Sequence, residues 1–238
     1  MNEHRGRSRV STRVVALAVT AAAALALVVS GASAEHDHSA THSHAASHNH
    51  ATTPPRAMNA ARLAFHDEMR KLWEDHVTWT RLAIVSFAAG LPDFEATAGR
   101  LLQNQVDIGN AIKPFYGDQA GEQLTDLLKE HITGAVALLE AAKSGDENAF
   151  AQAKDAWYEN GEQVARFLSE ANPRYWKFPV MAAMMKEHLD QTLQEAADRL
   201  AGNFEADIRD YEAIHLHILE MADTLSNGIM AQFPNRFH

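Results

Sequence analysis

Residues 124–145, LTDLLKEHITGAVALLEAAKSG, decide the fold class of this 238-residue chain. Apolar side chains recur in this stretch at intervals of three and four residues, which is the spacing of one face of an α-helix. Gly145 follows the pattern, and glycine is common just past the last turn of a helix. An amphipathic helix must bury its apolar face against other elements, so the stretch predicts a helical bundle.

An internal repeat extends this prediction to other parts of the chain. A shift of 57 residues aligns Lys129-Glu130-His131 with Lys186-Glu187-His188 without a gap. A fainter copy, at a shift of 55 residues, places Asp75-His76 on Glu130-His131. Repeated sequence units of this length predict repeated structural units.

Breaks rich in Gly, Pro, Ser and Asn divide the folded part into six segments of helical length. The breaks lie at residues 90–92, 114–117, 144–146, 172–173, 179 and 202–203. The last segment has the same three-and-four apolar spacing, from Phe204 and Ile208 to Ile229, and no segment alternates with a period of two. Because short connections keep successive helices adjacent, the chain is expected to be all-α, a six-helix bundle of three repeated antiparallel helical hairpins.

Each repeat carries a histidine on its apolar face, four residues after an apolar side chain: His76, His131 and His188. A single buried histidine is usually a core residue that is satisfied by a hydrogen bond. Three at equivalent positions favour a cluster in the bundle interior, which His215 or His217 of the last segment could approach. Helical bundles build metal sites from such inward-facing side chains, so these five residues are candidate ligands.

Further polar residues and methionines on these segments have two interpretations. Six polar residues could hold the imidazoles in place or could lie on solvated faces: Asp107, Asn110, Asn160, Glu162, Thr192 and Glu195. The methionines near His188 and in the last segment could favour copper or could fill the core. Glu212-x-x-His215 has the spacing of a di-iron ligand pair, but it stands alone in the folded part, which disfavours a ferroxidase.

Residues 1–34 have the pattern of a signal peptide. An arginine-bearing start precedes the apolar stretch Val14–Val29, and the small residues Ala32-Ser33-Ala34 provide a cleavage site. The mature chain is expected to begin at Glu35, to be secreted or held in the cell envelope, and to have no membrane span after cleavage.

Residues 35–57 are expected to form a disordered arm ahead of a helical domain at 58–238. The arm carries six histidines in three His-x-His pairs: His36, His38, His42, His44, His48 and His50. Imidazole has an ordinary pKa of about 6.5, so most of these rings are neutral near pH 7 and can bind metal. Copper and zinc are the first expected ions and nickel a third, although the arm could also be a polar spacer.

Composition limits the classes of function. The chain has a formal net charge of −10 and no cysteine. An acidic chain is a poor partner for nucleic acid, whose binding depends on Lys and Arg. Without thiolates, a metal would have to be held by His, carboxylate, Met or backbone oxygen. Motifs of common hydrolases, phosphate-binding loops and zinc proteases are also missing.

Three stretches carry a resemblance: LWEDHVTWTR (72–81), RLLQNQVDIGNAIKPFYG (100–117) and MADTLSNGIMAQFPNRF (221–237). In these stretches the chain resembles a bacterial family of helical proteins without a settled activity, whose members often carry inherited glycosyltransferase or acetylglutamate kinase labels. The all-helical pattern argues against both labels, because such enzymes are built on open α/β sheets. Family-like positions are His76, Arg81, Asp107, Asn110, Lys113, His131, Asn160 and His188; the His-rich arm falls outside the resemblance.

The leading hypothesis is therefore an exported protein that binds transition metal ions for capture, buffering or delivery to a metal transporter. A ferritin-like or hydrolytic metalloenzyme using His76, His131 and His188 is the first alternative. A helical interaction module that binds no metal is the second.

Overall fold

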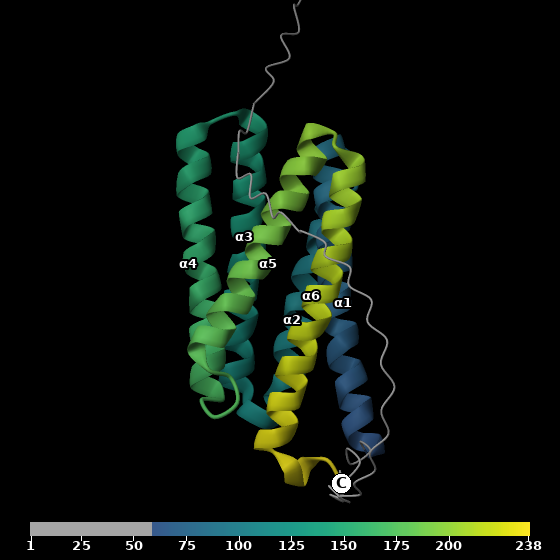
Figure 1. Ribbon diagram of the computed structural model, residues 1–238, viewed down its shortest axis with the longest axis vertical. Helices are drawn as coiled ribbons and strands as arrows, with labels where there is room; N and C mark the ends of the chain where they lie inside the picture. The colour runs from purple at the N-terminus through teal and green to yellow at the C-terminus, as the bar shows by residue number, and fades with distance from the viewer. Residues whose placement is uncertain (1–58) are drawn as a thin grey trace, which may run out of the picture. The chain divides into compact units, whose positions relative to one another are not determined.

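The computed structural model describes residues 59–238, which form six α-helices and one short 3₁₀ helix (Figure 1). The elements are α1 (Ala60–Ala89), α2 (Phe94–Tyr116), α3 (Asp118–Ser144), α4 (Glu147–Ala171), α5 (Phe178–Ala201), α6 (Phe204–Gln232) and η1 (Pro234–Arg236). The described part contains no strand, so the all-α prediction is confirmed. The expected signal peptide and the expected arm lie outside the described residues.

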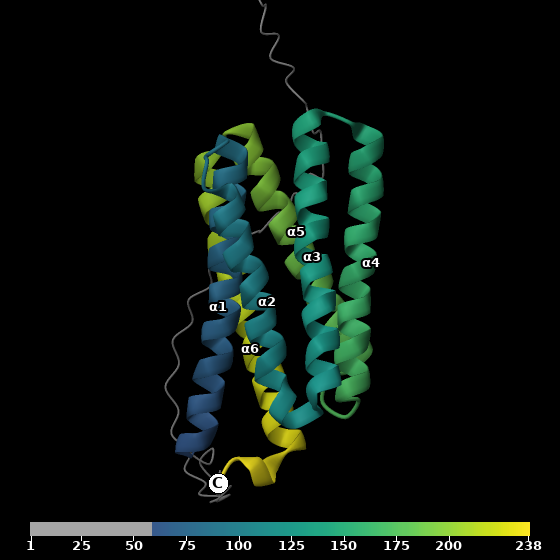
Figure 2. The same ribbon diagram turned by 180° about the vertical axis from the view of Figure 1, so that it is seen from behind.

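The helices form a closed ring. Each helix packs against its neighbours in the sequence, and α6 packs back against α1. In Figures 1 and 2, α5 runs obliquely from the side of α4 to the side of α6, and it also contacts α1. Through its contact with α1, α5 meets residues of the first hairpin.

The helix ends follow from local sequence. Gly145 and Gly202 adopt left-handed backbone conformations, with φ of 74° and 78°, directly after α3 and α5. Residues with a Cβ rarely adopt this conformation, whereas glycine does so at little cost. At the start of α1, the Asn59 side chain accepts a hydrogen bond from the Arg62 amide and donates another to the carbonyl of Phe237. The two ends of the described segment are thus tied together.

The interior contains one large apolar cluster shared by all six helices. Its largest buried side chains include Trp73 from α1, Trp176 from the α4–α5 connection, and the methionines Met69, Met181 and Met185. The methionines expected near His188 therefore fill the core. Within residues 59–238, no helix is both long and apolar enough to cross a membrane.

Candidate functional site

Three histidines from three different hairpins meet in the bundle interior. His76 of α1, His131 of α3 and His188 of α5 are 2%, 3% and 4% exposed. Their ring centroids are separated by 6.5 Å (76 to 131), 5.8 Å (76 to 188) and 6.0 Å (131 to 188). The rings thus form a nearly equilateral triangle, as three repeated hairpins around a common axis would produce.

The second helix of each hairpin supplies a polar side chain 29 residues after the histidine. Gln105 follows His76, Asn160 follows His131, and His217 follows His188 at this spacing. The second helix of each hairpin also donates a side-chain hydrogen bond to the backbone carbonyl four residues before the histidine. These bonds run from Asn104 to Leu72, from Asn160 to Leu127 and from His217 to Met184. The sequence repeat is therefore a structural repeat of side-chain contacts.

Asn160 fixes the tautomer of His131. Its Nδ2 donates to the Leu127 carbonyl at 3.1 Å, which leaves Oδ1 facing the imidazole. His131 Nδ1–H therefore donates to Asn160 Oδ1 at 3.2 Å. A neutral imidazole carries one proton, so Nε2 of His131 keeps a free lone pair.

Gln105 favours the other tautomer at His76. Its Nε2 donates to the Leu101 carbonyl at 2.8 Å and lies 3.2 Å from Nδ1 of His76, which accepts. The neutral His76 ring therefore carries its proton on Nε2. Oε1 of Gln105 is buried and has no hydrogen-bond partner.

His188 differs from the other two because its Nδ1 is buried and has no hydrogen-bond partner. His217 occupies the position at which an amide holds His131 in the second hairpin. The His217 ring stacks beside His188 with centroids 6.4 Å apart, while its Nε2–H donates to the Met184 carbonyl at 3.0 Å. Its Nδ1 lies 3.9 Å from Glu187. Buried polar atoms without partners are rare in folded proteins and mark sites where a ligand or water can bind.

Burial keeps the three imidazoles neutral. Removal from water lowers the pKa of His76 to about 3, with a smaller contribution from His131. The same cause lowers the pKa of His131 to about 4, although the bond from Asn160 opposes it. The pKa of His188 is well below 6.5, because of burial first and the neighbouring histidines second. All three rings are therefore unprotonated at neutral pH.

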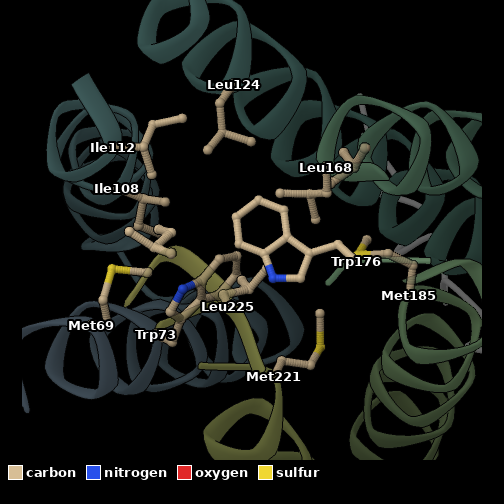
Figure 3. A pocket seen from close by; sticks show the side chains of 12 residues that line it. Met69, Trp73, Ile108, Ile112, Leu124, Leu168, Trp176, Met185, Met221 and Leu225 are labelled. Atoms are coloured by element: carbon tan, nitrogen blue, oxygen red, sulfur yellow. The ribbon is translucent and has the colours of Figure 1, made fainter. Parts of the chain in front are cut away.

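Two tryptophans cover the triad. The Trp157 indole stacks on His131 with centroids 5.2 Å apart and donates through Nε1 to the His131 carbonyl at 3.0 Å. Trp73 meets His76 edge to face at 5.7 Å, and its own Nε1 is buried without a partner. Trp73 also lines an apolar cavity of about 20 Å³ whose other walls include Trp176 and Met185 (Figure 3). Such a volume holds about one water molecule.

The acidic residue that precedes each histidine points away from the triad. Asp75 forms an ion pair with Lys71 on its own helix, while Glu130 and Glu187 are exposed. On a helix, consecutive side chains diverge by about 100°, so an inward histidine turns its neighbour outward. None of these three carboxylates is a ligand in this geometry.

Two buried carboxylates, Glu195 and Asp207, belong to a separate ionic network. Arg81 pairs with Glu195 at 2.8 Å and contacts both carboxylate oxygens of Asp207, and Arg199 pairs with Asp207 at 3.3 Å. Burial raises the pKa of Glu195 to about 7, against the opposing influence of Arg81. These carboxylates are held by arginines and are not offered to the triad.

The remaining candidates of the folded part lie elsewhere. His215 is part-exposed on α6, where its Nε2 lies 3.0 Å from Glu74 of α1, and Glu212 is exposed, so the Glu212-x-x-His215 pair does not meet the triad. Asn110 and Glu162 are exposed, whereas Asp107 and Lys113 are part-exposed on α2. Thr192 is buried and donates back to the His188 carbonyl. The six arm histidines, His36 to His50, lie outside the described residues.

A groove of about 420 Å³ between α3 and α4 reaches the layer around His131. Trp157 and Asn160, which both contact His131, line this groove, and Glu130 and Glu159 contribute to its walls. Gly134 allows the close approach, because a Cβ there would lie 3.2 Å from the Trp157 ring. One layer of side chains thus separates His131 from the groove.

The triangle of rings is slightly wider than a metal-bound triangle. An ion bound about 2.1 Å from a ring nitrogen lies about 3.2 Å from the ring centroid, whereas the point equidistant from the three centroids is about 3.5 Å from each. Accordingly, no group of three or more His, Asp or Glu side chains between residues 59 and 238 is close enough to hold an ion as it stands. An inward shift of about 0.3 Å per ring would close this gap once one nitrogen of each ring faces the centre of the triangle.

Among known proteins, no family model, no curated protein and no solved structure matches the chain.

Proposed function

We propose that this protein is an exported transition-metal-binding protein that captures, buffers or delivers copper-type or zinc-type ions. It would bind them at two places, the His-rich segment 36–50 and an internal site made by His76, His131 and His188. Delivery to a metal transporter of the cell envelope would follow from the same chemistry.

One observation carries the internal site: three neutral imidazoles lie about 6 Å apart, and Nδ1 of one of them has no partner. A core that needed only packing would be better served by apolar side chains, since each buried polar group costs free energy unless it is paired. Neutral imidazole is the commonest protein ligand for transition metals, and the rings here need no deprotonation before they bind.

Ligation requires a rearrangement at His76. As oriented by Gln105, this ring carries its proton on Nε2. Rotation of the Gln105 amide would offer its unpartnered Oε1 to a proton on Nδ1 and would free Nε2 as a ligand. Asn160 already holds His131 in the tautomer whose Nε2 is free.

The metalloenzyme alternative has less support. A catalytic metal site usually combines histidines with an open position for water, and many add a carboxylate that acts as ligand or base. The acidic neighbours Asp75, Glu130 and Glu187 point away, and Glu195 is paired with Arg81. The geometry therefore favours storage or transfer of the ion over chemistry on a substrate.

Elemental analysis of untagged protein tests the proposal. After equilibration with copper, zinc or nickel salts at pH 7 and gel filtration, the full-length chain should retain several equivalents of metal. A variant with the six arm histidines changed to serine should retain about one equivalent of at least one of these metals, with copper supplied both as Cu(II) and, with ascorbate, as Cu(I). Combining this variant with H76Q, H131Q and H188Q should remove that equivalent. The matched control combines the arm variant with H66Q and H215Q, two part-exposed histidines of α1 and α6, and should still retain it. Protein that retains no metal in any form would refute the proposal and leave a helical interaction module.

A further inference from the structure

The internal triad lacks a negative charge that could balance a bound cation. Imidazole binds a metal as a neutral ligand, and the carboxylates that precede His76, His131 and His188 in sequence lie toward the surface. The buried carboxylates Glu195 and Asp207 are engaged with Arg81 and Arg199. An ion in the triad would therefore keep its full charge in the interior.

The charge of the ion then decides how well it binds. The cost of moving an ion from water into a low-dielectric interior grows with the square of its charge, so a divalent ion pays about four times the penalty of a monovalent one. Divalent sites in proteins commonly offset this penalty with carboxylates, thiolates or a bound hydroxide, and the triad contains neither a carboxylate nor a thiolate. The site is consequently better suited to a monovalent ion that accepts imidazole.

The shape of the triad points the same way. The three ring centroids form a nearly equilateral triangle, with sides of 5.8 to 6.5 Å. An ion in the plane of the triangle would see ligands at about 120°, which corresponds to a centroid spacing of about 5.5 Å, whereas a tetrahedral ion needs about 5.2 Å and a fourth ligand. The nearby cavity is apolar, and the side chains that line it offer no oxygen. Three-coordinate geometry thus requires the smaller rearrangement.

From these observations we infer that the internal site selects Cu(I) over divalent ions, in a trigonal all-imidazole arrangement of His76, His131 and His188. This inference rests on the proposed metal-binding function and narrows it to one oxidation state. Copper is the biological metal whose monovalent ion binds nitrogen and sulfur ligands in proteins. The six arm histidines, which are open to water and lack this constraint, would still bind divalent ions.

Competition titrations on the full chain with its six arm histidines changed to serine test the inference. Cu(I) is supplied anaerobically as its bicinchoninate complex, and Zn(II) and Ni(II) are supplied from chromophoric chelators of known affinity. We expect one equivalent of Cu(I) to bind, with an affinity at least about a hundredfold above that for Zn(II) or Ni(II). X-ray absorption of the copper form should show three nitrogen neighbours and no fourth ligand.

Variants assign the signal to the triad. H131Q and H188Q, checked for folding by circular dichroism, should each weaken Cu(I) binding by at least about tenfold, whereas H215Q should leave it unchanged. Zn(II) bound as tightly as Cu(I) would overturn the inference while leaving metal binding intact. Absence of binding by every ion would overturn the metal-binding function itself. Equal weakening by H215Q and H131Q would place the ion outside the triad.

Discussion

Acidification of the metal-free protein from pH 7 to pH 5 should lower its free energy of unfolding by about 4 kcal/mol through four buried groups. The pKa values of His76 and His131 fall to about 3 and about 4 in the folded protein, and that of His188 lies well below 6.5. In the unfolded chain these rings take up protons below about pH 6.5. Stability is therefore lost as the pH falls through that value, at about 2 kcal/mol per histidine over this range.

Glu195 acts in the opposite direction. Its pKa is raised to about 7 in the folded protein, so it takes up a proton on folding between about pH 4.5 and 7 and gains stability as the pH falls. This gain is about 2 kcal/mol and offsets part of the loss from the three histidines. The three histidines and Glu195 therefore change the free energy of unfolding in opposite directions as the pH falls.

Urea unfolding followed by circular dichroism at half-unit steps from pH 7 to pH 5 measures the effect. H131Q should reduce the loss to about 2 kcal/mol, and E195Q should increase it to about 6 kcal/mol. H66Q, which changes a part-exposed histidine of α1, is the control and should follow the wild type. A wild-type stability that stays constant or rises between pH 7 and pH 5 would contradict the assignment of three buried neutral histidines.

Three further predictions concern packing and hydrogen bonding. N160L leaves the His131 Nδ1–H without a partner and removes the side-chain bond to the Leu127 carbonyl, which keeps its helical bond, so it should cost about 1 to 3 kcal/mol in urea unfolding. A cost below about 0.5 kcal/mol would show that Asn160 does not hold the ring. G228A places a Cβ against the indole nitrogen of Trp176 and should destabilise the protein by about 1 to 3 kcal/mol in thermal unfolding. The control G99A adds a Cβ in α2 that meets nothing within 4 Å, so it should be neutral or stabilising by up to about 1 kcal/mol. Similar effects of the two changes would argue against tight packing at Gly228. H217N gives the third hairpin the amide that Asn160 provides in the second and should supply a partner for His188 Nδ1. We expect a single His188 ring tautomer in long-range ¹H–¹⁵N spectra and a free energy of unfolding higher by about 1 kcal/mol. An unchanged His188 spectrum would count against the equivalence of the hairpins.

The sequence predicted the six helices and the inward direction of the three histidines for one reason. The apolar period and the sequence repeat both reflect helical geometry, because residues three or four positions apart lie on the same face of a helix. His131 and His188 lie at the same place in homologous hairpins, and the closed ring brings such places together.

Other features depended on packing that a single sequence does not specify. His215 and His217 were equal candidates, yet two residues on a helix differ by about 200°, so only His217 faces inward. Phe204 and Ile208 follow the apolar period but are 55% and 53% exposed, because periodicity identifies a face and not how far a neighbouring helix covers it. A polar residue 29 positions after each of the three histidines is visible in the sequence and could have identified their neighbours. The residues at this spacing are Gln, Asn and His, so they share no single residue type.

The hydrogen bond between Asn59 and Phe237 means that the order of helices along the chain is partly arbitrary. A short peptide could join these two ends, and new ends could be opened in the exposed turn at Gly145, without removing any helix from the ring. Such a circular permutant would keep every contact around the three histidines while making α4 the first helix to be synthesised. The packing around the three histidines therefore does not depend on which helix stands first in the chain.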